Sequence, residues 1–157
     1  MNTPLTVTIV LLLLISAPVG AQTASESGLE TANYKSVAVL IEGLSTDAVS
    51  IGLTTDRIQT RVELRLRSAG LTPGKASSKN ETYLYVRVKL GGSAYSAAVE
   101  YKRQVVFITG NRRYRYLATT WESASIGTHA RSRVYVMNAL DQNLDKFLNA
   151  YLKANQK

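Results

Sequence analysis

Residues 83–90 alternate strictly between two kinds of side chain, and this pattern constrains the fold more than any other feature of the sequence. Successive side chains of a β-strand point to opposite faces of a sheet, so the alternation predicts a strand with one buried face and one wetter face. The buried face would carry Leu84, Val86, Val88 and Leu90, and the wetter face Tyr83, Tyr85, Arg87 and Lys89.

Two more strands are predicted directly after this one. The turn at 91–93 leads into a long extended segment, 94–108, which can be one bent strand. Residues 109–112 supply a hairpin turn, because Gly and Asn tolerate the positive φ that two-residue loops require. Residues 113–123 return as a third strand, and a glycine breaks the pattern in 124–128. The sequence therefore predicts an antiparallel meander.

A helix is predicted between Thr54 and Gly70. Thr54 has the side chain of an N-cap, and Asp56 lies in the first turn, where the helix dipole favours a carboxylate. Gly70 fits the left-handed position after the helix and brings Leu71 against Leu66, as in a Schellman ending. The apolar stripe that would face the core consists of Ile58, Val62, Leu66 and Ala69.

The remaining elements lie near the two ends of the chain. The continuous apolar run 37–41 predicts a strand covered on both faces, and the segments 44–52 and 72–81 are predicted to be loops, with a single helical turn possible after Ser45. A last helix is predicted over 131–154, with an apolar stripe wide enough to cover a sheet. The stripe consists of Val134, Met137, Leu140, Leu144, Phe147, Leu148 and Tyr151.

The resulting order is β-α-β-β-β-α, which predicts an α+β fold: a two-layer α/β sandwich with both helices on one face of a mostly antiparallel sheet. This order, with the helix ending Arg67-Ser68-Ala69-Gly70-Leu71 and the polar loop after it, resembles the small periplasmic α/β domains of the TolB N-terminal and curli-assembly type. The resemblance spans most of residues 36–157. It implies an envelope module that works through protein contacts rather than catalysis, and it carries over no functional residue.

The first twenty-one residues have the features of a secretory leader. An apolar run from Val7 to Ala17 is too short to span a bilayer, and the small residues of Val19-Gly20-Ala21 suit cleavage before Gln22. The segment ahead of the run contains no Lys or Arg, and the alternative is an anchor that stays attached. We expect a signal peptide at 1–21, a flexible lead-in at 22–35, a single domain at 36–157, and export to the periplasm or the medium.

Composition narrows the kind of partner. The chain has no cysteine, which excludes disulfides, thiolate metal sites and a cysteine nucleophile. Its net charge is +8, and the excess lies in the middle, where 57–133 holds fifteen Lys and Arg against four Asp and Glu. Such a field attracts anionic partners and is screened by salt. Lipid headgroups, acidic polysaccharide, nucleic acid and acidic proteins all qualify.

A basic, tyrosine-rich sheet face is the predicted binding surface. Arg and Tyr on neighbouring strands can hold phosphates and stack on rings, although the same residues also suit a plain solvated face. We expect a non-catalytic binding or interaction module that meets an anionic envelope component or another envelope protein, with nucleic acid as the remaining alternative. The predicted partner-binding residues are Tyr83, Tyr85, Arg87, Lys89, Arg113 and Arg115.

Candidates for catalysis are few. Glu100 and Glu122 lie on the predicted meander strands, where a small envelope hydrolase could use them as an acid/base pair. The other interpretation is that each carboxylate partners a neighbouring Arg or Lys. His129, the one histidine, is expected at the solvent-facing start of the last helix. We therefore expect no enzyme, no cofactor and no metal site. The sequon at Asn80 matters only where the host glycosylates asparagine.

Overall fold

A computed structural model of the protein describes residues 28–77 and 82–156. The predicted leader at 1–21 and the sequon at Asn80 lie outside the described residues. The elements are β1 (Ser36–Ile41), α1 (Thr46–Ser50), α2 (Thr55–Ser68), β2 (Thr72–Lys75), β3 (Thr82–Gly91), β4 (Ala94–Thr109), β5 (Arg112–Thr128) and α3 (Arg133–Asn155). Across these residues no helix is both long enough and apolar enough to cross a bilayer.

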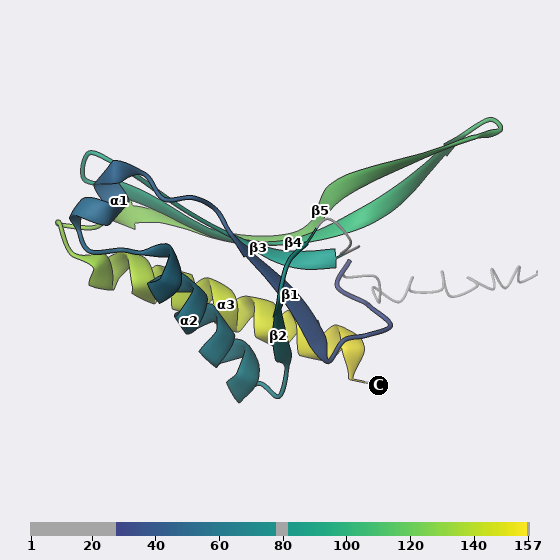
Figure 1. The fold of residues 1–157 in the computed structure, drawn as a ribbon, viewed down its shortest axis with the longest axis horizontal. Helices are drawn as coiled ribbons and strands as arrows, with labels where there is room; N and C mark the ends of the chain where they lie inside the picture. The colour runs from purple at the N-terminus through teal and green to yellow at the C-terminus, as the bar shows by residue number, and fades with distance from the viewer. Residues whose placement is uncertain (1–27, 78–81, 157) are drawn as a thin grey trace, which may run out of the picture.

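The predicted α+β fold is confirmed. One five-stranded sheet has the order β2-β1-β3-β4-β5, and α2 and α3 lie together on one side of it (Figure 1). β1 runs parallel to both β2 and β3, whereas β3, β4 and β5 form the predicted antiparallel meander. The crossover from β1 through α2 to the sheet is what places the helix on the apolar face of β3.

The segment after α2 differs from its prediction as a loop, because Thr72–Lys75 forms the edge strand β2. The Thr72 amide donates to the Lys35 carbonyl at 2.7 Å, and the two strands then pair from Ser36 to Val39. Pro73 carries no N–H, which an edge strand tolerates. The strand is short and polar, so it has neither the alternation nor the β-branched residues by which strands are recognised.

Both predicted ends of α2 are confirmed. The Thr54 hydroxyl accepts from the Arg57 amide at 3.1 Å, which satisfies one free donor of the first turn. At the other end the Leu71 amide donates to the Leu66 carbonyl at 2.9 Å, and Gly70 has a φ of +76°. This is the Schellman geometry, and it turns the chain sharply into β2.

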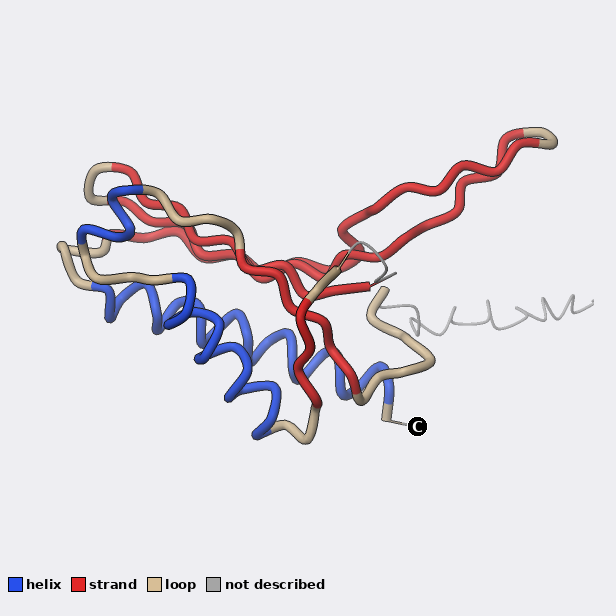
Figure 2. The backbone as a smooth tube through the Cα atoms, in the orientation of Figure 1, coloured by secondary structure: helices blue, strands red, loops and turns tan. Residues whose placement is uncertain are grey.

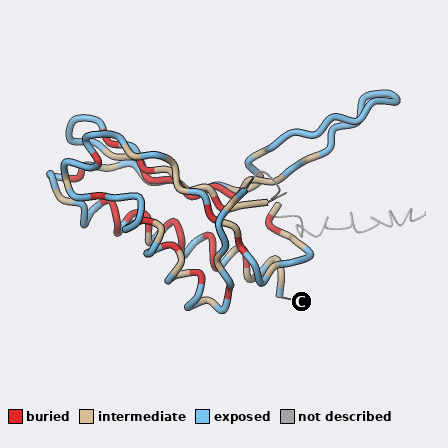
Figure 3. The backbone as a smooth tube through the Cα atoms, viewed as in Figure 1, coloured by how far each residue is buried: buried red, intermediate tan, exposed pale blue. Residues whose placement is uncertain are grey.

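The start of α3 is two residues later than predicted, since Ser132 is its N-cap and Ala130 and Arg131 have positive φ values of 42° and 56°. In the first turn Val134 is 56% exposed and Val136 is buried in its place, because Val136 lies four residues before Leu140 on the buried face of the helix. From Met137 onward the predicted stripe is buried. Figure 3 shows this band of buried residues between the helices and the sheet.

The last strand is longer than predicted. β5 continues through 124–128, where the glycine was expected to break the pattern. A Cβ on Gly127 would lie 2.9 Å from the Tyr95 hydroxyl oxygen, so the glycine makes room for a ring on the neighbouring strand. Its role is close packing within the sheet and not a break in it.

The packed part of the chain begins ahead of Ser36, within the stretch expected as a lead-in. Leu29 is fully buried in the core. The backbone carbonyl of Leu29 accepts from Asn155 Nδ2 at 3.0 Å, and the Thr31 amide donates to Asn155 Oδ1 at 2.9 Å. These bonds fasten the segment to the end of α3.

Candidate functional site

The wetter face of β3 lies on the side of the sheet opposite α2 and α3, as the alternation predicted. Leu84, Val86 and Val88 are buried toward the helices, while the Tyr and cationic residues between them are partly or fully exposed. Lys102 on β4 lies directly opposite Tyr83, and its Nζ is 5.1 Å from the centroid of the Tyr85 ring. We call this surface the open face.

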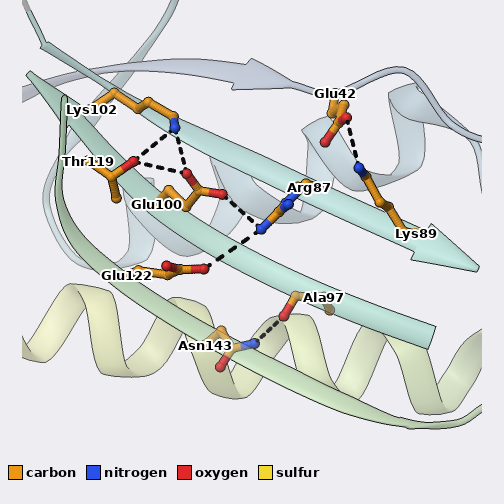
Figure 4. Close-up of polar contacts among 9 residues, drawn as sticks. All are labelled: Glu42, Arg87, Lys89, Ala97, Glu100, Lys102, Thr119, Glu122 and Asn143. Atoms are coloured by element: carbon orange, nitrogen blue, oxygen red, sulfur yellow. Dashed lines mark hydrogen bonds and ion pairs between the residues drawn. The ribbon is translucent and has the colours of Figure 1, made fainter. Parts of the chain in front are cut away.

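On the open face each predicted cation has a carboxylate partner (Figure 4). Arg87 Nη2 lies 3.2 Å from Glu100 Oε1 and 3.7 Å from Glu122 Oε1. Lys102 Nζ is 2.6 Å from Glu100 Oε2, and Lys89 Nζ is 3.8 Å from an oxygen of Glu42. Three cations therefore face three carboxylates, and this part of the surface carries little net charge.

The two candidate catalytic carboxylates do meet, since Glu100 and Glu122 are directly opposite across β4 and β5. Burial alone would raise the pKa of Glu100, but the hydrogen bond and charge of Lys102, with help from Thr119 and Arg87, outweigh it and lower the pKa. A glycosidase acid needs the opposite shift, because it must hold its proton near neutral pH. This environment favours the ion-pair interpretation.

His129 is buried, at 4% exposure, where a solvent-facing side chain was expected. Its Nδ1 accepts from the Arg131 amide at 3.1 Å, so its Nε2 carries the proton and donates to the Gly92 carbonyl at 3.0 Å. The ring ties the turn between β3 and β4 to the start of α3. The prediction failed because the positive φ values after His129 fold the segment back onto the sheet.

A buried polar residue on α3 escaped the sequence analysis. Asn143 is fully buried; its amide donates to the Ala97 carbonyl at 2.9 Å, and its oxygen accepts from Ser123 at 2.7 Å and from Ser125 at 3.2 Å. Figure 4 shows it reaching from the helix to the sheet. The signal in the sequence was an amide side chain inside an apolar helical stripe. The hydrogen bonds of Asn143 hold α3 against β4 and β5.

The second pair of predicted binding residues, Arg113 and Arg115, lies far along β5 on a projecting hairpin. β3 pairs with β4 only as far as Thr82 and Arg103, so the strands beyond that point pair with each other alone. They leave the sheet as a two-stranded ribbon (Figure 2). We call residues 104–117 the arm.

A β-bulge marks the base of the arm. Tyr101 pairs with Trp121 and Lys102 with Thr119, which leaves Thr120 as the extra residue on β5. A bulge bends its strand and increases the local twist, and here the ribbon turns away from the helix layer. The Thr120 hydroxyl donates to the Gly28 carbonyl at 2.6 Å, so the N-terminal segment is fastened to the bend.

The arm is coloured as exposed along most of its length in Figure 3, and residues of both faces are exposed. The register places Phe107 opposite Tyr114, and Ile108 opposite Arg113, on alternate faces. The face that continues the side of Tyr101 carries Val105, Phe107, Tyr114 and Tyr116. The other face carries Val106, Ile108, Leu117, Arg113 and Arg115.

The predicted binding surface is therefore divided in two by the structure. Tyr83, Tyr85, Arg87 and Lys89 belong to the open face, while Arg113 and Arg115 belong to the arm. From Lys102 to Thr120 the sequence contains no Asp or Glu. Among the described residues no carboxylate lies within ion-pair distance of an arm guanidinium, in contrast to Arg87.

The comparisons with known proteins add little to this geometry. The sequence matches no protein-family model and no curated protein. Its structure is similar to that of a minor lipoprotein from Acinetobacter baumannii, at 12% identity, over 76% of this chain and 89% of that one, with a TM-score of 0.26. A TM-score this low carries no argument about function, and the resemblance to TolB and curli-assembly domains is not confirmed.

Within 28–77 and 82–156 there is also no group of three or more His, Asp or Glu side chains placed to hold a metal ion. Asp141 and Asp145, the acids that follow His129 on the last helix, pair instead with α2: Arg65 lies 3.5 Å from Asp141 and 2.6 Å from Asp145. These pairs hold the two long helices together. Among the described residues, the arm is thus a region where unpaired arginines lie beside exposed apolar side chains.

Proposed function

We propose that this protein is an exported, non-catalytic interaction module of the cell envelope, and that it binds an anionic partner through the arm. The leader predicted at 1–21 supports export. The observation that carries the proposal is the position of Arg113 and Arg115 on a ribbon that projects from the body, where no described carboxylate lies within ion-pair distance of them.

The charge balance of the two surfaces supports the arm over the open face. A cation already within 3–4 Å of a carboxylate has to give up that contact before it can serve a partner, whereas an unpaired guanidinium on an exposed strand loses only water. Arg also suits the role, because its planar fork binds carboxylate or phosphate with two parallel hydrogen bonds.

Exposed apolar side chains beside these arginines support the same conclusion. Phe107 is 60% exposed and Ile108 is 61% exposed, whereas Phe147 on α3 and Ile58 on α2 are fully buried. Large exposed apolar patches of this kind mark interaction sites. A solvated hairpin with no partner would be expected to carry polar residues at these positions.

Charge reversal on the arm tests the proposal. A photo-crosslinking residue at Val106 should capture the partner in the native envelope, and the R113E/R115E variant should reduce the captured product at least tenfold. The matched control R57E/R131E makes the same change in net charge at two exposed arginines outside the arm, and it should leave capture intact. Undiminished capture by R113E/R115E would remove the arm as the binding surface.

A further inference from the structure

We infer that the anionic partner of the arm is a lipid bilayer surface, into whose headgroup layer the arm inserts. This inference rests on the proposed function and names the partner. The first step concerns the face of the arm that carries Arg113 and Arg115, where cross-strand neighbours combine one aliphatic and one cationic side chain. Ile108 lies opposite Arg113, and Val106 lies opposite Arg115.

Such pairs match the two layers of a bilayer interface. Aliphatic side chains favour the boundary between headgroups and acyl chains, while the long Arg side chains can reach the phosphates above it. Arg112, at the turn of the arm, adds a third arginine on the opposite face of the ribbon. The arm therefore offers cations and apolar groups at the spacing of adjacent strands, with no carboxylate to repel anionic headgroups.

The second step is that apolar residues occupy both faces of the arm. A protein partner with an ordinary surface would cover one face and leave the other in water. A headgroup layer closes around an inserted ribbon and covers both. Phe107, Tyr114 and Tyr116 on the second face fit the same location, because aromatic rings concentrate at membrane interfaces.

A second copy of the chain is a weaker candidate for the occupant. At exposures of 60%, 37% and 56%, the rings of Phe107, Tyr114 and Tyr116 offer roughly 300 Å² per copy, on side chains of about 150–250 Å² each. A stable protein interface buries about 800 Å² on each partner. The arm face alone falls well short of that area, and the net charge of +8 on each copy opposes self-association.

The third step is the shape of the molecule. The arm extends beyond the body (Figure 1), so it can enter a flat surface without a clash between that surface and the helices. The outer edges of its two strands keep unpaired backbone groups, which forbid a position in the hydrocarbon but are satisfied by water among headgroups. The geometry thus describes interfacial attachment by the arm and not a membrane span.

Vesicle binding by the exported protein tests the inference. Cosedimentation with vesicles containing phosphatidylglycerol should exceed that with pure phosphatidylcholine at least tenfold. The R113E/R115E variant should bind the anionic vesicles at least about thirtyfold less, since each lost Arg near such a surface contributes roughly one factor of five and the added carboxylates are repelled. The V106S/I108S variant should also lose affinity at unchanged charge, and R57E/R131E serves as the folded, charge-matched control.

The F107W variant reports the depth of the arm. Its fluorescence should be quenched by lipids brominated near the headgroup end of the acyl chain and less by lipids brominated near the chain terminus. Equal binding of the wild-type protein, R113E/R115E and V106S/I108S to anionic vesicles would overturn the inference. Protein adducts at Val106 without vesicle binding would overturn it while leaving the arm as a protein-binding surface. If the protein gives no adducts at Val106 and does not bind vesicles, both the proposed function and this inference are rejected.

Discussion

The open face and the arm share two strands, β4 and β5, and both carry Arg and Tyr, but the open face also includes β3, and the two differ in what surrounds them. On the open face α3 covers the reverse side, and Glu42 after β1, Glu100 on β4 and Glu122 on β5 meet the cations. Among the described residues no helix covers either side of the arm, and no carboxylate pairs with its arginines. An Arg and Tyr pattern in a sequence therefore indicates a binding surface only where the fold places no carboxylate beside the arginines.

Substitution of the two phenylalanines of the chain is expected to give the largest difference in stability between the two regions. Phe147 is fully buried, with ring centroids 5.1 Å from Tyr151 and 5.5 Å from Trp121, whereas Phe107 on the arm is 60% exposed. F147A should lower the free energy of unfolding by about 3–5 kcal/mol. F107A should change it by less than about 0.5 kcal/mol. Urea denaturation of both variants measures the difference, and similar losses would mean that the arm packs against the body.

The acid cluster of the open face should make stability depend on pH. The pKa of Glu100 is lowered in the folded state, so its stabilising effect is present above its ordinary pKa near 4.5 and is lost as the pH falls through the folded value. E100Q should cost about 1.5–3 kcal/mol at neutral pH, through its lost charged hydrogen bonds. The gap between E100Q and wild-type protein should close below about pH 4.5 in urea titrations, and a gap independent of pH would contradict the ion-pair role.

Substitution of Asn143 tests how α3 is held against β4 and β5. Replacing it with Ala removes a donor to Ala97 and an acceptor for two serine hydroxyls, and should lower the free energy of unfolding by about 1–3 kcal/mol. Asn138 is an exposed asparagine on the same helix, and N138A is the matched control with little expected effect. A loss in N143A no larger than in N138A would show that these buried bonds do not hold the helix to the sheet.

The smallest expected effect on stability is that of the arm arginines. R113E/R115E should change the midpoint of urea denaturation by no more than the equivalent of about 0.5 kcal/mol, because these side chains have no ion-pair partner among residues 28–77 and 82–156. R87E, on the open face, should cost more, since it places a third carboxylate beside Glu100 and Glu122. If both variants lost equal stability, the two surfaces would not differ in the way described.

Sequence patterns predicted the architecture well where local chemistry decides it. The caps of α2 and the alternation of β3 depend on neighbouring residues, and both were confirmed. β2 was missed because a polar edge strand takes its structure from its partner β1 and not from its own residues. The buried ring of His129 was missed because its bonds to Gly92 and Arg131 exist only after the chain folds back.

The arm could have been found by comparing strand lengths. β3 has ten residues while β4 has sixteen and β5 seventeen, so part of the hairpin had to extend past its neighbour. The sequence allowed a bent strand over 94–108, but the bulge at Thr120 contains no Gly or Pro that would have indicated where the bend lies. The pairing of Arg87 with Glu100 and Glu122 depends on register, which alternation alone does not fix.

The most direct test of the central claim places the same photo-crosslinking residue at two isoleucines, one in each region. Ile108 lies on the arm, and Ile126, at 82% exposure, lies on the open face of β5. In the native envelope, position 108 should give crosslinked products that disappear in the R113E/R115E background, while position 126 should give few. Products of equal yield at both positions, or products at 126 alone, would contradict the account.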